Sequence, residues 1–551
     1  MSSTPFDPSG QPEYLTSHAP QEPRSGRKKT VALAAVGVVV AGAVGAGAWA
    51  VTQLVGGGPG AASVVPDTAL FYAAVDLDPS ASQKIEALQT IKKFPALDEE
   101  LDLGSRDDLR RWVFDQILED GECEGLDYGD DIEPWIGDKL GIAMVAGDKQ
   151  PDPVIALQVT DEDKAEQGIS AFFEACAPDE TFGIAFLDGY ALVAQNDDIA
   201  DAARSAAEKA PLADDAEYTA ALDELGALGI ATFYVSPEGP AALNESTMGQ
   251  MAGGAEIPTF CTETPSGLSP EELQELDEMC EGLVPSEDAQ QKLDELFADF
   301  QGAAATLRFE DGGVELAAAG SGFPAMGSTA TSVADLPAST VAALGFSLPE
   351  DWTDTLETQL KASFGPMFFE QMMSQIEAQT GLQMPEDLEK AFGADSVLAV
   401  DGSTDWEAVG DSEDPGVVKA GIRVASDEAD VRRVVSALLA AVRAGNPDFV
   451  KVEAGGGYVA VGFDDEYLDE LLAGGDLGSS ETFEDAVAEA DKARVALFLD
   501  FDAADGWLER FVKATGGSDD DVANAKPLSA FGLSGWVDGD TTHMVLRLST
   551  D

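Results

Sequence analysis

Short runs of alternating apolar and polar positions recur along most of the chain and predict β-strands joined by tight turns. Residues 182–194 alternate on both sides of Asp188-Gly189, and residues 449–463 alternate on both sides of three glycines, so each is expected to form a hairpin. Between such runs lie apolar residues at helical spacing, preceded by acidic or Ser residues that favour helix starts. The pattern predicts an α+β fold, with antiparallel sheets and helices covering one face.

The same order of signals occurs twice. A strand, an acidic turn and a helix over residues 154–176 match a strand, turn and helix over residues 417–442, and the two predicted hairpins follow them in turn. Each copy closes with a further hairpin, at residues 305–319 and 528–548. The sequence therefore predicts two pseudo-symmetric, duplicated domains of antiparallel sheet plus helices.

One stretch near the N-terminus has a different pattern. Residues 31–51 form a run of twenty-one residues without a charged side chain. The run follows a basic cluster, Arg24, Arg27, Lys28 and Lys29. About 20 apolar residues suffice to cross a bilayer as one helix, and a basic flank is retained in the cytoplasm. We expect a single-pass transmembrane helix at residues 30–55, with a cleaved signal peptide ending at Ala48-Trp49-Ala50 as the alternative.

These patterns give a domain organisation and a localisation. The expected localisation is the cell membrane, with a cytoplasmic N-terminus and extracytoplasmic C-terminal domains. The predicted segments are a cytoplasmic disordered tail at 1–29, the transmembrane helix at 30–55, a Gly-rich tether at 56–63, a first α+β repeat at 64–325 and a second at 333–551.

All four cysteines fall in the predicted extracytoplasmic part, at Cys123, Cys176, Cys261 and Cys280. An even number of cysteines in an oxidising compartment indicates two disulfides, for which three pairings exist. Three of the four lie in insertions that only the first repeat carries, and Cys176 lies in its helix. The favoured pairs are therefore Cys123 with Cys176 and Cys261 with Cys280, each fastening an insertion.

The formal net charge of −72 changes the picture of possible partners. Nucleic acid is excluded as a partner, because each phosphate contact needs a Lys or Arg and the chain has only 31 of them. The acidic surface either attracts divalent cations or basic partners, or keeps an exported protein hydrated.

Candidate chemistry is sparse. Only two histidines occur, His18 and His543, and we interpret His543 as a residue on the surface of a strand. The sequence contains none of the usual motifs of nucleophilic hydrolases, zinc proteases or phosphate-binding loops, so no catalytic residue and no cofactor is assigned. The best single candidate for a cation site is the pair Asp76 and Asp78 at a strand end; the alternative is a turn that caps the following helix.

Four short motifs carry a family resemblance. They are Asp76-Leu77-Asp78-Pro79-Ser80, Gln83-Lys84, Lys93-Phe94-Pro95 and Trp135-Ile136-Gly137-Asp138. With these motifs the chain resembles an actinobacterial family of membrane-anchored proteins of unknown function, the DUF3352-like proteins. The resemblance implies a short cytoplasmic tail, one transmembrane helix and a long exported domain, and it implies no activity.

The expected function is that of a membrane-anchored, extracytoplasmic binding or scaffold module of the cell envelope. Its expected partners are the membrane, through residues 30–55, an envelope protein, and weakly bound divalent cations. The alternatives are a carboxylate-dependent envelope hydrolase and an acidic module that binds divalent cations. Enzyme activity is not the favoured hypothesis, because no histidine is placed to activate a nucleophile.

Overall fold

The computed structural model describes most of the chain from residue 60 onward. Within 60–551 the segments left aside are 78–79, most of 97–124, 148–150, 179, 247–296, 324–325, 350–351, 365, 405–414, 443–448 and 515.

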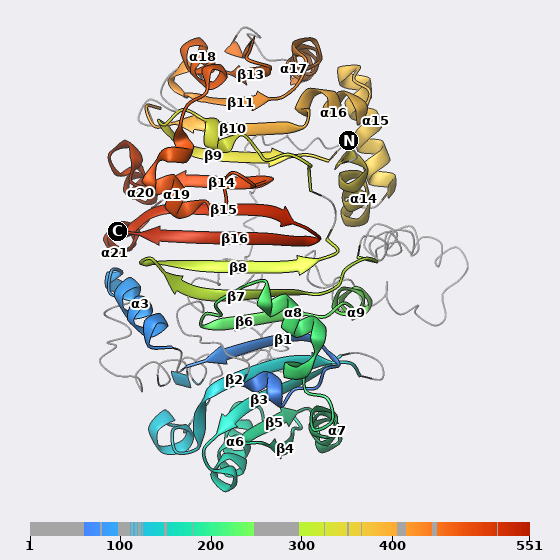
Figure 1. Cartoon of the computed structure of the whole chain (residues 1–551), viewed down its shortest axis with the longest axis vertical. Coiled ribbons are helices and arrows are strands. Elements are labelled where there is room, and N and C mark those ends of the chain that lie inside the picture. The colour runs from blue at the N-terminus through green and yellow to red at the C-terminus, as the bar shows by residue number, and fades with distance from the viewer. Residues whose placement is uncertain are drawn as a thin grey trace, which may run out of the picture.

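Sixteen strands form one antiparallel sheet in the described part of the chain (Figure 1). Their bounds are β1 Ala69–Asp76, β2 Ile136–Val145, β3 Asp152–Val159, β4 Gly183–Leu187, β5 Tyr190–Ala194, β6 Ala231–Val235, β7 Ala303–Glu310, β8 Gly313–Ser321, β9 Thr340–Ser347, β10 Asp395–Asp401, β11 Ala420–Val424, β12 Lys451–Gly455, β13 Tyr458–Gly462, β14 Val495–Asp500, β15 Leu528–Asp538 and β16 Thr541–Thr550.

The hairpin turns follow the expected chemistry. Asp188 and Gly189, which join β4 to β5, have positive φ angles of 46° and 80°. Two consecutive positive φ values suit the tight turn that matches the twist of paired strands, and Asp-Gly favours it. The hairpin predicted at residues 182–194 is thereby confirmed, and β12 and β13 confirm the one at 449–463.

The strand order repeats across the sheet. The order in space is β12-β13-β11-β10-β9-β14-β15-β16-β8-β7-β6-β1-β2-β3-β5-β4. We call β1 to β8 the first half and β9 to β16 the second half. Read from each outer edge toward the centre of the sheet, the two halves have the same strand order, with each number in the second half higher by eight. The halves meet where β8 pairs with β16, from Ser321 opposite Thr541 to Val314 opposite Leu548.

Thirteen α-helices are described with the sheet. They are α3 Ala81–Ile91, α6 Glu162–Cys176, α7 Asp197–Ala207, α8 Ala216–Asp223, α9 Gly239–Ser246, α14 Trp352–Phe364, α15 Pro366–Thr380, α16 Glu386–Phe392, α17 Glu428–Val442, α18 Asp465–Ala473, α19 Glu481–Ala486, α20 Ala503–Ala514 and α21 Asp519–Ala525. Shorter helical turns are η2 Ala61–Ser63, η3 Tyr128–Ile132, η4 Leu212–Asp214, η5 Val333–Asp335, η6 Pro415–Val417 and η8 Leu477–Ser479.

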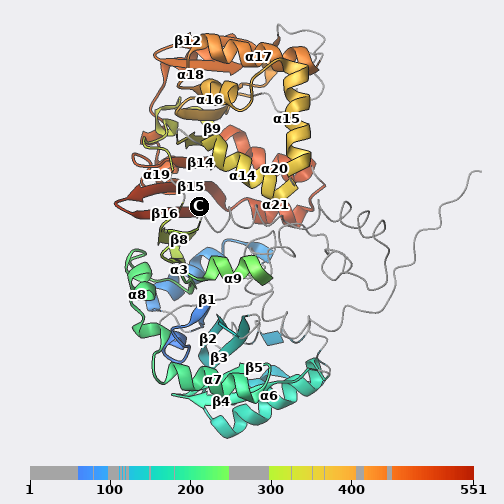
Figure 2. The same cartoon turned by 90° about the vertical axis from the view of Figure 1, so that its right-hand side faces the viewer.

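Helices lie on both faces of the sheet. Figure 2 shows α7, α8 and α19 on one side, called the front face, and α9, α14, α15, α20 and α21 on the other, called the back face. On the front face, two continuous cores pack strand residues such as Tyr72 and Phe498 against α8 and α19, through Tyr218 and Phe483. Since successive strand residues point to opposite faces, the residues between these core positions point to the back face.

The α6 helix shows how the local sequence fixes one element on the back face. Asp161 caps its N-terminus, with the side chain accepting a hydrogen bond from the backbone N of Lys164 at 3.2 Å, as acidic helix starts predict. Gly168 lies against the ring of Trp135, where an added Cβ would come within 2.1 Å of Nε1. Glycine at this position therefore lets α6 approach the start of β2.

The predicted fold class is wrong in two respects. It placed two separate duplicated domains after a transmembrane helix, whereas β8 and β16 join all described strands into one antiparallel sheet, with helices on both faces rather than on one. None of the helices in the described residues is long and apolar enough to cross a membrane, and the predicted span at 30–55 lies outside those residues. The repeat boundaries 64–325 and 333–551 stay predictions.

Candidate functional site

Of the predicted carboxylate pair, Asp76 and Asp78, the structure describes only Asp76. Asp76 ends β1 with 7% of its surface exposed, and its Oδ2 lies 3.7 Å from Nζ of Lys139 on β2. Asp78 lies outside the described residues. Among the side chains that the structure describes, no group of three or more His, Cys, Asp or Glu could hold a metal ion. The cation site at Asp76 and Asp78 stays a prediction.

Two of the four cysteines also lie among the described residues, and two lie outside them. Cys123 and Cys176 form a disulfide, with their Cα atoms 4.5 Å apart, which is the first of the two predicted pairs. The bond joins the segment before η3 to the last residue of α6, inside a back-face core that includes Trp135, Ile155 and Phe173. Cys261 and Cys280 lie outside the described residues.

His543 is more enclosed than expected for a residue on a strand surface. Its side chain is 15% exposed on β16, and its ring stacks on Trp536 with the ring centroids 5.1 Å apart. Its Nε2 lies 3.8 Å from a carboxylate oxygen of Glu224, which follows α8 in the first half. No Ser or Cys contacts this ring in the interactions described, so the arrangement suits a packing role across the two halves.

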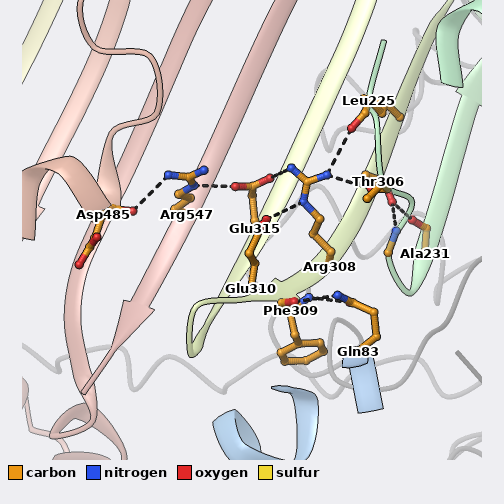
Figure 3. A network of polar contacts seen from close by, with 12 residues as sticks. Gln83, Leu225, Ala231, Thr306, Arg308, Phe309, Glu310, Glu315, Asp485 and Arg547 are labelled. Carbon is orange, nitrogen blue, oxygen red and sulfur yellow. Dashed lines mark hydrogen bonds and ion pairs between the residues drawn. The ribbon is translucent and has the colours of Figure 1, made fainter. Parts of the chain in front are cut away.

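A charge cluster occupies the front face where the halves meet (Figure 3). Glu315 on β8 is 2% exposed and lies directly opposite Arg308 on β7 and Arg547 on β16. Its carboxylate forms ion pairs with both guanidinium groups, and the Arg547 Nε is 2.6 Å from Oε2. Arg308 also donates to the backbone carbonyls of Leu225 and Ala227, at 3.3 and 2.9 Å. We call Arg308, Glu315 and Arg547 the central charge cluster.

The second half carries different chemistry at the equivalent positions. Arg308 and Glu315 face each other two residues from the tip of the β7–β8 hairpin, where Glu310 opposes Gly313. Trp536 and His543 face each other two residues from the tip of the β15–β16 hairpin. An ion pair in one half thus corresponds to a stacked aromatic pair in the other.

A buried serine in the second half has its hydroxyl fully engaged. Ser332 Oγ donates to Oδ2 of Asp395 at 2.5 Å and accepts from the Arg423 guanidinium at 2.8 Å. All three side chains are buried, and Arg423 also lies over the ring of Tyr458. A nucleophilic serine needs a base within reach and access for the substrate. This cluster therefore fixes η5 to the sheet rather than forming a reaction centre.

Two neighbouring carboxylates with raised pKa values, Asp500 and Asp502, lie at the end of β14. Asp500 accepts hydrogen bonds from the backbone N of Asp502 and of Ala503, at 3.0 and 2.9 Å, where α20 begins. Burial raises the pKa of Asp500, and burial together with the nearby Asp551 and Asp500 raises the pKa of Asp502. The first carboxylate caps a helix, so its hydrogen bonds have a structural purpose.

The most unusual surface is an apolar row on the back face. Eight neighbouring strands each place one Leu or Ile directly opposite the next, and opposed residues in antiparallel strands share a face. From β11 to β7 these residues, called the apolar row, are Ile422, Leu398, Leu344, Leu497, Leu533, Leu546, Leu316 and Leu307.

The row is buried at one end and open at the other. Leu307 is 6% exposed in a core that also holds Ala87 of α3. Leu344, Leu398 and Ile422 are 37%, 42% and 37% exposed, although large apolar side chains inside a sheet are usually covered. Contiguous exposed apolar residues are typical of interaction sites.

The alternation of apolar and polar residues along each strand does not reveal this row. Each leucine occupies an alternating position in a strand, and that pattern alone predicts a core residue. Only the register between strands lines the leucines up, and only the placement of the helices leaves three of them exposed. The signal in the sequence was the repeated Leu or Ile near the middle of successive second-half strands.

Comparison with known proteins identifies one region of the chain. The family model described as "Protein of unknown function (DUF3352)" matches residues 32–182. Residues 32–182 are therefore similar to this family of unknown function. This match confirms the resemblance to a family of unknown function, and it covers β1 to β3, α6 and the Cys123–Cys176 disulfide. No curated protein and no solved structure matches the chain.

Proposed function

We propose that the protein is a non-catalytic binding module of the cell envelope that acts outside the cytoplasm. The single observation that carries the binding function is the open end of the apolar row. Leu344, Leu398 and Ile422 lie side by side on three paired strands, each more than a third exposed. Contact between water and apolar side chains of this size is unfavourable. Covering them with a ligand therefore lowers the free energy.

The disulfide supports the compartment. Disulfides form and persist in oxidising compartments and are rare in the cytosol of most organisms. The bond between Cys123 and Cys176 lies in the back-face core that also includes Ile155. The charge of −72 also suits a protein that works in a hydrated, exposed environment.

The carboxylate-dependent hydrolase is less well supported by the described residues. A hydrolase of this kind needs two carboxyl groups placed on either side of a substrate bond. Asp500 and Asp502 are close in sequence and have raised pKa values, but Asp500 is engaged at the start of α20. A binding surface therefore explains more of the structure than an acid–base site does.

The binding function can be tested with an uncharged fluorescent probe of apolar surfaces, Nile red. We expect saturable binding to the native full-length protein, and a loss of about tenfold in affinity in the double variant Leu344→Gln/Leu398→Gln. The matched control is Leu88→Gln on α3, because Leu88 is also 37% exposed but belongs to the helix at the buried end of the row and not to its open part. Probe binding that is unsaturable, or that the two sets of substitutions change equally, would contradict the proposal.

A further inference from the structure

We infer that the open part of the apolar row is the docking site of a basic amphipathic helix from a partner protein. This inference rests on the proposed binding function and names its ligand class. It follows from three features of the back face: its length and width, the charge of the helices at the strand ends, and the side chains that border it.

The first feature is size. Leu307 and Leu316 pack in the core with α3, and the remaining part of the row crosses six strands, from Ile422 on β11 to Leu546 on β16. Neighbouring strands lie about 4.8 Å apart, so five spacings cover roughly 24 Å. An α-helix of about 16 residues has this length. Helices that bind apolar surfaces do so with residues spaced i, i+3, i+4 and i+7, which form a stripe of comparable length.

The surface is also wide enough for a helix. Two further rows flank the apolar row on the same face, since residues two positions along each strand point the same way. One flanking row includes Phe346, Val495 and Met544, and the other includes Leu499 and Phe531. A helix with its side chains is about 10 Å across, which these three rows accommodate.

The second feature is charge. Figures 1 and 2 show α14 and α15 at one end of the strands and α20 and α21 at the other, all on the back face. Their described side chains include eight carboxylates, Asp354, Glu357, Glu370, Glu377, Glu509, Asp519, Asp520 and Asp521, against three cations, Lys361, Arg510 and Lys513. A ligand that lies along the row meets an acidic border at both sides, so complementarity requires basic residues on its polar face.

The same charge disfavours the other occupants. A second copy of this chain would bring another net charge of −72 to the same surface. Anionic lipid head groups would be repelled for the same reason. A basic helix alone satisfies both the apolar row and its acidic border.

The third feature is the adaptability of the border. Met372 and Met373 on α15 are half-buried, and Met544 on β16 is 42% exposed. Phe368, near the start of α15, is 56% exposed. Methionine has an unbranched, polarisable side chain that adjusts to irregular partners and is enriched at surfaces that bind varied helices. The border can therefore repack around an incoming helix.

The test uses the full-length protein and a synthetic 18-residue peptide of Leu and Lys whose leucines form one helical stripe. Fluorescence anisotropy of the labelled peptide should show saturable binding that weakens as salt rises. We expect the Leu344→Gln/Leu398→Gln variant to lose about tenfold in affinity and Leu88→Gln to lose none. A peptide with the same composition but scrambled leucines should bind at least tenfold more weakly.

Three outcomes would overturn the inference. Equal binding of the ordered and scrambled peptides would show attraction by charge alone. Concentration-dependent dimerisation by sedimentation, abolished by the row substitutions, would assign the surface to a second copy. Binding of a long-chain fatty alcohol, but not of the peptide, would assign it to a lipid chain. In the last two cases the proposed binding function still stands, whereas absence of row-dependent binding of peptide and Nile red alike removes both.

Discussion

The two halves of the sheet share one strand order but differ in what covers their back face. In the second half, Leu344 lies opposite Leu398 and is 37% exposed. At the same place in the first half, Ala73 lies opposite Ile142 and is 6% exposed. The first half thus has a smaller side chain at this position and a covered surface. The same topology can serve as a closed support in one half and as an open surface in the other.

In the first half, the back face of the sheet is covered by α6 and by the segment that the disulfide holds in place. Ile142 and Ile155 pack with α6 and with the segment that the Cys123–Cys176 disulfide fastens down. The corresponding helix of the second half, α17, packs against Val424 and Val459 and contacts the edge strand β12. The described helices α14 and α15 make their main contacts with each other and with α17. The open row is therefore a consequence of where these helices are placed.

The largest expected effect concerns the point where the halves meet. Glu315→Ala removes the shared anion of the central charge cluster. Arg308, whose side chain is only 18% exposed, then keeps only the half-exposed Glu310 as an ion-pair partner, and Arg547 loses its ion pair with Glu315. Breaking a buried ion pair in this way costs about 3 to 5 kcal/mol. His543→Ala, at the equivalent position of the second half, should cost only about 1 kcal/mol.

Urea unfolding of the two variants measures this difference. Glu315→Gln is the control, because it keeps the shape of the side chain and some of its hydrogen bonds. Equal losses for Glu315→Ala and His543→Ala would show that the two halves are joined by packing alone, with no special contribution from the charges.

The next effect concerns the cover of the first half. Replacing both Cys123 and Cys176 by Ser should lower the free energy of unfolding by about 2 to 4 kcal/mol, because the bond closes a loop across a sequence separation of 53 residues. It should also make Ile142 and Ile155 more accessible, so Nile red binding should rise. The first half would then resemble the second.

Native-state hydrogen exchange locates this change. Faster exchange is expected in β2, β3 and α6, with β10, β11 and α17 unchanged as the internal control. Equal acceleration in both halves would mean that the disulfide stabilises the whole sheet and not the local cover.

The smallest effect concerns the link between β14 and α20. Because burial and neighbouring carboxylates raise the pKa of Asp502, the folded state holds its proton more tightly than the unfolded state does. The stability that this group contributes is present at low pH and is lost as the pH rises above the usual range of an aspartate. Asp502→Asn should therefore match the native protein near pH 3 and melt roughly 1 °C higher at pH 7.

Asp521→Asn is the matched control, because the pKa of Asp521 is shifted in the opposite direction to that of Asp502. Hydrogen bonds from Ser518 lower the pKa of Asp521, so its contribution is present at neutral pH and is lost as the pH falls through its lowered pKa. Thermal melts at several pH values should show this variant below the native protein at pH 7, with the gap closing toward low pH. Parallel pH profiles for the two variants would contradict the assigned causes.

Local elements could be predicted from the sequence because their signals are local. The Asp188-Gly189 turn, the cap at Asp161 and the periodicity of α6 each depend on residues within one turn or hairpin. The disulfide of Cys123 and Cys176 followed from an insertion placed against a helix. These features need no knowledge of the rest of the fold.

The single sheet could not be predicted in the same way. Whether β8 ends a domain or pairs with β16 depends on contacts between strands far apart in the chain, such as Ala317 opposite Val545. Alternation reveals that a strand exists and which residues share a face, but it does not name the neighbouring strand. The apolar row was missed for the same reason, since Leu344 and Leu398 become one surface only through their register.

The pairing of β8 with β16 has a consequence for how the protein behaves at high concentration. Strand edges carry unpaired backbone groups that can recruit other chains into fibres. Joining the halves places the long strands β8 and β16 in the interior, so that in the described sheet only β4 and β12 remain at the borders. Each of these is only five residues long, Gly183–Leu187 and Lys451–Gly455, and short border strands are poor templates for polymerisation.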